Sequence, residues 1–175
     1  SFGSAAVFES ADSRYISATF DSNSNKVVIA YRDQGNSNYG TAIVGTVSGT
    51  SISFGSAAVF ESAASIDISA TFDSNSNKVV IAYRDTGNSN YGTVIVGTVS
   101  STSISFGSPT VFESADSYHV FATFDSNDNK VVIAYRDLGN SSYGTAVVFQ
   151  VASTSTNLTS ENFIGFAKDN VADGA

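Results

Sequence analysis

The hydrophobic and polar residues follow one another in short stretches that predict β-strands and not helices. Residues 15–20 alternate with a period of two, and residues 26–32 (KVVIAYR) are a nearly continuous apolar run, as in a strand covered on both faces. Two further strands are expected, at 41–47 and 51–60. Turn-forming Ser, Asn, Asp and Gly residues separate the strands, at 9–13, 21–26, 33–40 and 48–51. No stretch has a sustained helical period, so the pattern predicts an all-β fold.

The strand pattern repeats every 52 residues. The tetrapeptide SFGS begins at Ser1, Ser53 and Ser105, which defines three tandem repeats. The repeats cover residues 1–52, 53–104 and 105–156, and residues 157–175 follow them as a C-terminal strand and tail, or the start of a further region. The first two repeats differ only at positions 12, 14, 15, 34, 42 and 49 and their equivalents.

Four short antiparallel strands in about 50 residues are typical of a β-propeller blade. In this frame the chain begins in a fourth strand, at residues 2–8, and residues 162–167 supply a last one. The predicted fold is therefore all-β, with β-propeller-like blades of four antiparallel strands. A solenoid or a row of small β-sandwiches is the competing architecture.

The repeat unit resembles that of sialidase-like propellers. The resemblance lies in the segments "YISATFDSNSNKVVIAYRD" (15–33) and "YGTAIVGTVSGTSISFGSAAVF" (39–60), and "VSGTSISFG" (47–55) occupies the place of the Asp-box without its Asp, Gly-Gly or Trp. The unit is also similar to tandem repeats in tail-fibre or surface proteins of marine phages and bacteria. The resemblance implies that the loop at 33–40 and the connector at 9–13 emerge on one face, and the hairpin at 21–26 on the other.

The loop at 33–40 and its copies are the candidate ligand site. Most differences between the first two repeats fall in this loop or near the connector, and variable loops on a rigid scaffold often bind ligands. Arg forks, Asn amides and Tyr rings suit sugar hydroxyls and their C–H faces. The alternative is that these residues only stabilise the turn, with Asp33 accepting backbone N–H groups and Gly35 adopting a positive φ. The candidate residues are Arg32, Asn36, Asn38, Tyr39, Arg84, Asn88, Asn90, Tyr91, Arg136, Asn140 and Tyr143.

Catalysis is not expected. Arg32, Arg84 and Arg136 resemble a carboxylate-binding triad, but each stands beside its own Asp, which favours local pairing. A glycosidase needs two carboxylates in different environments, whereas the glutamates at 9, 61 and 113 are copies of one environment. The Tyr–Glu nucleophile pair and the acid Asp of sialidases cannot be placed, and His119 has no Ser or Cys partner at a readable spacing. A degenerate glycoside hydrolase is the less favoured reading.

The charge and the residue types limit which partners and which metal or disulfide sites are expected. The net charge of −8 argues against nucleic acid and against anionic membranes. The absence of Cys excludes disulfides and thiolate zinc sites. "DSNSNK" (21–26) is similar to the start of a calcium loop but has Lys26 where the turn Gly would stand, and it lacks the distal Glu. No metal or cofactor is therefore expected.

Three functions remain open from the sequence. A non-catalytic module that binds glycans or a cell-surface receptor is expected first, and a purely structural or assembly repeat is the main alternative. The degenerate glycoside hydrolase is the third and least favoured. Ser, Thr, Asn and Gly richness without Cys suits an extracellular, virion or cell-surface location. Propellers usually have about 4–8 blades, so three repeats predict either two chains in a six-bladed ring or a longer parent chain.

Overall fold

The strands follow the chain in simple order. The computed structural model describes residues 1–152. Its strands are β1 (Ser13–Asp21), β2 (Lys26–Asp33), β3 (Tyr39–Ser48), β4 (Ser51–Phe54), β5 (Ala58–Asp73), β6 (Lys78–Asp85), β7 (Tyr91–Ser100), β8 (Ser103–Phe106), β9 (Thr110–Asp125), β10 (Lys130–Asp137) and β11 (Tyr143–Phe149).

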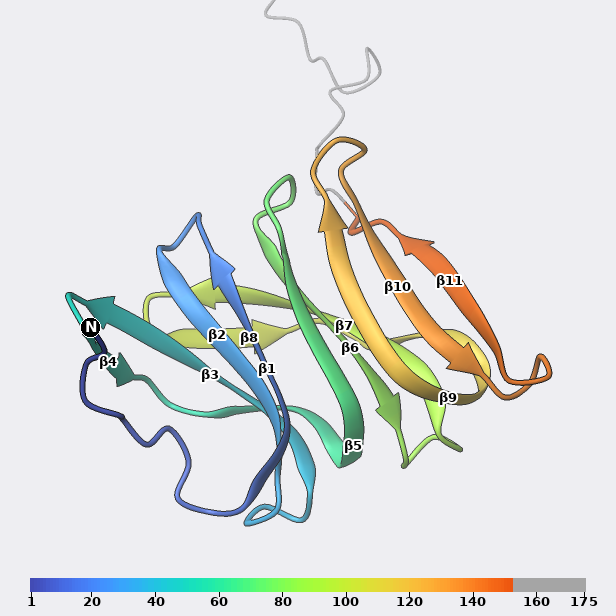
Figure 1. Cartoon of the computed structure of the whole chain (residues 1–175), viewed down its shortest axis with the longest axis horizontal. Coiled ribbons are helices and arrows are strands. Elements are labelled where there is room, and N and C mark those ends of the chain that lie inside the picture. The colour runs from blue at the N-terminus through green and yellow to red at the C-terminus, as the bar shows by residue number, and fades with distance from the viewer. Residues whose placement is uncertain (153–175) are drawn as a thin grey trace, which may run out of the picture.

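All these strands belong to one open antiparallel sheet (Figure 1). The hydrogen-bonded order is β1-β2-β3-β5-β6-β7-β9-β10-β11, with β4 paired to β3 and β8 paired to β7. The described residues contain no helix, so the all-β prediction is confirmed, and no helix among them could span a membrane. They form an open sheet and not a closed propeller.

The two halves of each long strand, β5 and β9, pair with different neighbouring strands. The first half of β5 pairs with β3, with Thr41 opposite Val59, and its second half pairs with β6, with Ala70 opposite Ile81. The strand β9 joins β7 to β10 in the same way. The sheet therefore turns back on itself at each long strand, and this brings its faces into contact.

Several predicted strand limits are wrong. The strand expected at 51–60 is split into β4 and the start of β5, and the segment 61–65, expected as a connector, continues within β5. Residues 2–8 are not a strand, because no neighbouring strand of the described residues pairs with them. The strand expected at 162–167 lies outside the described residues.

The tight hairpins form as predicted. Asp21 Oδ1 accepts the backbone N–H groups of Asn23 (2.9 Å) and Ser24 (3.0 Å), and Asn25 has a φ of 56°. Asn tolerates this left-handed conformation better than most residues. Asp73 and Asp125 hold their hairpins in the same way.

The core lies between neighbouring parts of the sheet. One cluster packs Val28 and Val44, of β2 and β3, against Ile68 and Val79, of β5 and β6. A second cluster packs β6 and β7 against β9 and β10. Figure 1 shows β1, β5 and β9 side by side at the front. Serine hydroxyls connect these strands, since Ser17 Oγ accepts the N–H of Ala70 (3.0 Å) and Ser69 Oγ that of Ala122 (2.9 Å).

Candidate ligand-binding edge

Hydrogen bonds hold the candidate loops against the connectors. We call residues 34–38, 86–90 and 138–142 the Asn turns; they join β2 to β3, β6 to β7 and β10 to β11. The N–H of Gln34 donates to Asp12 O (3.1 Å), that of Thr86 to Ala64 O (3.1 Å) and that of Leu138 to Asp116 O (3.1 Å). The variable positions on the turns and the connectors therefore lie together at one end of the strands, which we call the candidate edge.

Hydrogen bonds within each Asn turn fix its shape. Asp33 Oδ1 accepts the N–H of Asn36 (3.1 Å), and Asn36 O accepts the N–H of Tyr39 (2.9 Å). The expectation for Gly35 is wrong, because Ser37 (φ 54°) and Asn38 (φ 64°) take the left-handed positions instead. Gly35 is needed for close approach, since a Cβ there would lie 2.6 Å from the Cβ of Ala11.

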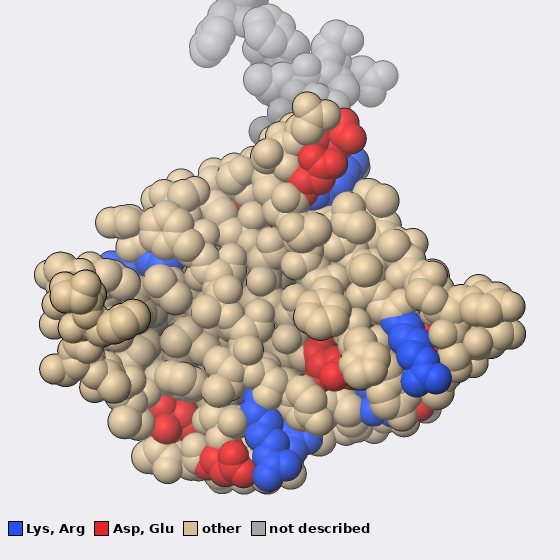
Figure 2. Space-filling view, in the orientation of Figure 1, with Lys and Arg blue, Asp and Glu red and all other residues tan. Residues whose placement is uncertain are grey.

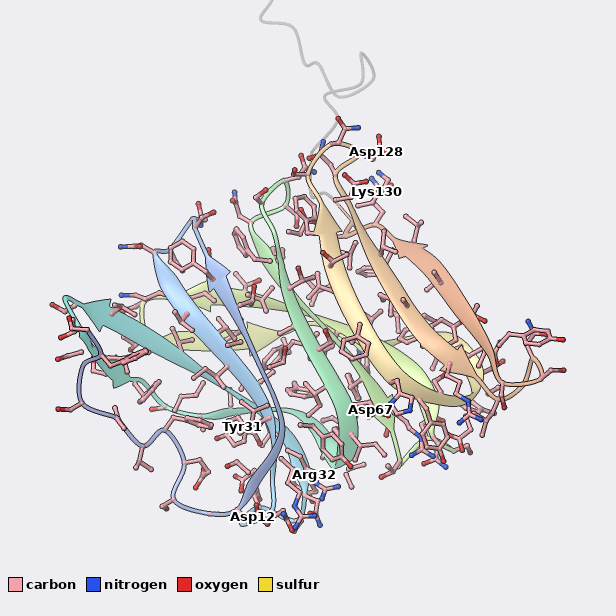
Figure 3. All side chains as sticks on the ribbon, viewed as in Figure 1. Asp12, Tyr31, Arg32, Asp67, Asp128 and Lys130 are labelled. Carbon is pink, nitrogen blue, oxygen red and sulfur yellow. The ribbon has the colours of Figure 1, made fainter. Side chains whose placement is uncertain are left out.

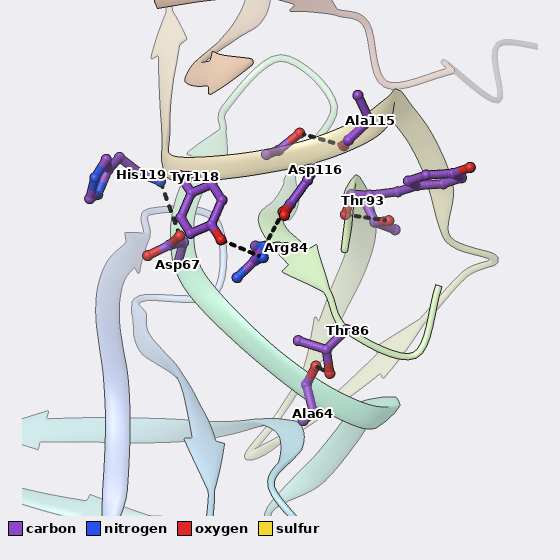
Figure 4. Close-up of polar contacts among 11 residues, drawn as sticks. Ala64, Asp67, Arg84, Thr86, Thr93, Ala115, Asp116, Tyr118 and His119 are labelled. Carbon is purple, nitrogen blue, oxygen red and sulfur yellow. Dashed lines mark hydrogen bonds and ion pairs between the residues drawn. The ribbon is translucent and has the colours of Figure 1, made fainter. Parts of the chain in front are cut away.

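The three candidate arginines lie in three different environments. Arg84 is buried; its Nε donates to Asp116 Oδ1 (2.6 Å), and its Nη2 donates to the Tyr118 hydroxyl (3.0 Å) (Figure 4). Arg32 lies over the Tyr15 ring at 5.1 Å, and its buried Nε has no partner among the described residues. Arg136 is exposed.

The expected pairing of each arginine with its adjacent Asp is wrong, because the described residues show no such ion pair for Arg32, Arg84 or Arg136, and Arg84 reaches the next repeat instead. Its guanidinium also lies 4.0 Å from the centre of the Tyr118 ring. Position 64, equivalent to Asp116, is Ala, so Arg32 has no carboxylate to meet there. The sequence difference at position 64 was visible, but only the packing of neighbouring repeats connects it with Arg32.

Three Tyr–Glu pairs were missed by the sequence reading. The Tyr31 hydroxyl donates to Glu9 Oε2 (3.3 Å), and Tyr83 donates to Glu61 in the same way (3.1 Å). The third pair is Tyr135–Glu113 (2.9 Å). The constant 22-residue separation was the available signal, but it could not show contact.

These tyrosines are buried, and burial is the main reason why the pKa of each is raised far above its ordinary value. Burial also raises the pKa of Glu61, and the nearby Asp85 carboxylate adds to this. A nucleophilic phenol needs easier ionisation, so these environments favour a structural role for the Tyr–Glu pairs.

The candidate residues differ in exposure. Asn36, Asn88 and Asn140 are exposed, as is the ring of Tyr143, whereas Tyr39 and Tyr91 are half-buried; so are Asn38 and Asn90. No pocket is found within residues 1–152. Figure 2 shows few charged side chains over most of the viewed face.

The hairpins lie at the other end of the strands. Figure 3 shows Asp12 and Arg32 at the lower edge, and Asp128 and Lys130 at the top. A substitution in a hairpin can therefore serve as a control for one in an Asn turn. The side chain of Asp67, also near the lower edge, accepts the N–H of His119 (3.0 Å) and joins two neighbouring repeats.

Comparison of the chain with protein-family models, with curated proteins and with solved structures finds no match.

Proposed function

We propose that the chain is a non-catalytic, β-propeller-like repeat module of a virion or cell-surface protein, and that it binds glycans or a receptor through the Asn turns and connectors. The observation that carries the proposal is the hydrogen-bonded edge on which exposed Asn amides recur every 52 residues, beside Tyr rings that are half-buried at 39 and 91 and exposed at 143. Amides can fix sugar hydroxyls, and an aromatic ring can cover a sugar C–H face.

The repetition supports binding by avidity. Weak equivalent sites on one rigid scaffold gain apparent affinity when they engage a multivalent surface together. The accessible groups for this role are Asn36, Asn88, Asn140 and the Tyr143 ring. Arg84 supports the edge from within, because it is buried and its Nε and Nη2 donate to Asp116 and Tyr118.

A glycan array probed with the protein displayed at high valency tests the proposal. Changing Tyr39, Tyr91 and Tyr143 together to Ala should abolish binding, because each ring that a ligand covers is worth about 1–3 kcal/mol. The control is Lys26→Ala, in the hairpin at the opposite end of β2, which should bind as the parent does. Unaltered glycan and host-cell binding by a folded triple variant would overturn the proposal.

A structural or assembly repeat is the second candidate function. It is favoured by the two core clusters, each of which is formed between consecutive repeats and not within one. Repeats of this kind gain stability from their neighbours and can extend a fibre or spacer. A chain that self-associates but binds no glycan or cell surface would favour this alternative.

A further inference from the structure

The faces that pack inside the chain recur at its two ends, where they are exposed. Two interfaces form between consecutive repeats. In the first, the face of β2 and β3 packs against that of β5 and β6, and in the second, the equivalent face of β6 and β7 packs against that of β9 and β10. At the first repeat the face of β1 and β2, which is equivalent to that of β5 and β6, has no neighbour among residues 1–152. At the third repeat the face of β10 and β11, which is equivalent to that of β2 and β3, has none among the described residues. The chain therefore carries both halves of an interface that it already forms twice.

We call the exposed face of β1 and β2 the leading face, and define it by Ile16 and Phe20. Ile16 is 55% exposed, whereas its equivalent Ile68 is 7% exposed. Phe20 is also exposed, and its equivalent Phe72 is buried. The side chains are the same, so the difference reflects the neighbouring repeat that packs on Ile68 and Phe72 and that residues 1–152 do not supply to Ile16 and Phe20.

We call the exposed face of β10 and β11 the trailing face, and define it by Ala134, Ala146 and Val148. Val148 is 62% exposed, whereas its equivalent Val44 is fully buried. Both alanines are exposed too, and their equivalents in the first repeat, at positions 30 and 42, are fully buried. Phe121, exposed on β9, replaces the Ser69 that bonds the next repeat, and so enlarges this apolar surface.

The outer edge of β11 is unpaired among the described residues, unlike that of its equivalents. The edge of β3 pairs with β4 and with the first half of β5, where Gly40 is opposite Glu61 and Thr41 opposite Val59. The same register, moved by the repeat length, places Gly144 of β11 opposite Glu9 and Thr145 opposite Val7. An open edge with this pattern can accept a further strand.

Residues 2–8 already lie where such a strand would be needed. A Cβ on Gly3 would collide with the carbonyl oxygen of Thr50, as one on Gly55 would with that of Thr102. The ring centre of Phe8 lies 5.1 Å from that of Tyr31, and Phe60 lies 5.2 Å from Tyr83. The segment therefore occupies the place of residues 54–60, but it lacks the strand that pairs with them.

Two side-chain sites complete the match. A Cβ on Gly40 would overlap the Phe60 ring, whereas one on Gly144 would meet nothing within 4 Å. The equivalent of Phe60 for Gly144 is Phe8 of another copy. Arg84 pairs with Asp116, and the equivalent pair at the ends is the exposed Arg136 with the exposed Asp12.

We propose that the trailing face and β11 edge of one copy bind residues 6–12 and the leading face of a second copy, head to tail. The contact is heterologous, so it closes a ring or extends a chain according to the rotation at each junction. It buries both apolar faces, pairs the open edge and joins Arg136 to Asp12 of the second copy. The inference does not depend on whether the Asn turns bind a ligand.

Disulfide trapping tests the register, because the chain has no Cys of its own. A Val7→Cys chain and a Thr145→Cys chain, differently tagged and mixed, should form a mixed disulfide, because Cα atoms of facing strand residues lie within disulfide reach. The control pairs Thr145→Cys with Ser22→Cys, at the tip of an exposed hairpin. Equal trapping in both mixtures, or none in either, would overturn the proposed register.

Sedimentation velocity over micromolar concentrations tests the association itself. We expect a dimer or longer concentration-dependent species, and a Val148→Asp variant should weaken association at least about tenfold, because it buries an unpaired charge. Val148 is exposed in the single chain, so the variant should still fold. A parent chain that remains a monomer throughout would overturn the proposal.

Exchanging the two charges distinguishes this specific contact from nonspecific association. Arg136→Asp alone and Asp12→Arg alone should each weaken association, and the double variant should restore it in large part, because the pair forms between copies. Two single variants that associate as the parent does, or a double variant weaker than both, would contradict the proposed contact.

Discussion

Arg84 Nε lies 2.6 Å from Asp116 Oδ1, although 32 residues separate them along the chain. The arginine belongs to β6 and the aspartate to β9, so this ion pair joins consecutive repeats. It lies beside the hydrogen bond from Leu138 to the backbone of Asp116 and therefore supports the edge that carries the Asn turns. The relationship shows how contacts between repeats organise the candidate site.

Arg84→Met should destabilise the fold. It leaves the Asp116 carboxylate without its partner and removes a donor to the Tyr118 hydroxyl. The side chain of Asp116 remains 28% exposed, so the loss should be about 2–3 kcal/mol, below the range for a fully buried pair. Urea unfolding measures it. Arg14→Met, which removes an exposed pair with Asp12, is the control and should cost less than about 1 kcal/mol.

Ala64→Asp should stabilise the fold. It places a carboxylate where Asp116 meets Arg84 and so offers a partner to the buried Nε of Arg32. A charge-assisted hydrogen bond of this kind contributes about 1–2 kcal/mol. The double variant that combines Ala64→Asp with Arg32→Met should not show this stabilisation, because the new carboxylate then has no arginine to bind. A stabilisation that persists in the combined variant would show that the new carboxylate acts elsewhere.

The Tyr83–Glu61 pair should make the fold sensitive to alkaline pH. Burial is the main cause that raises the pKa of Tyr83 above its ordinary value of about 10, and the Glu61 carboxylate adds to it. The stabilising contribution is therefore complete below about pH 10, and it is lost as the pH rises through the higher pKa of the folded state.

Tyr83→Phe should flatten the fall in unfolding free energy above pH 10. The measurement is urea unfolding at a series of pH values from 8 to 11. Tyr143→Phe, on an exposed ring, should keep the pH dependence of the parent. Two identical pH profiles for the parent and Tyr83→Phe would exclude the buried phenol as the cause.

Gly92→Ala and Gly144→Ala form a matched pair. The first adds a Cβ that overlaps the Phe112 ring, and overpacking of this kind costs about 1–3 kcal/mol. The second adds a Cβ into open space, so the stability of the single chain should not change. If Phe8 of a second copy packs there, Gly144→Ala should instead weaken self-association in sedimentation velocity. Equal effects of both changes on unfolding would contradict the local geometry.

Much of the fold could be predicted from the sequence because strand and turn signals are local. The runs that include Val28 and Val80 predict covered strands, and the hairpins closed at Lys26 and Lys78 follow from Asp and Asn side chains that bond their own turn. The period of 52 residues was also plain, and so was the grouping of variable positions near the Asn turns.

Only the tertiary structure decided which residues meet, because contacts between repeats join segments far apart in the chain. Residues 2–8 are predicted to form a strand, yet a strand needs a partner with free backbone groups, and the part of the chain that the structure describes supplies none to them. Arg32, Arg84 and Arg136 read as copies, yet their surroundings differ because each depends on the repeat that follows. Identical local sequences thus acquire different burial and charge pairing from their neighbours alone.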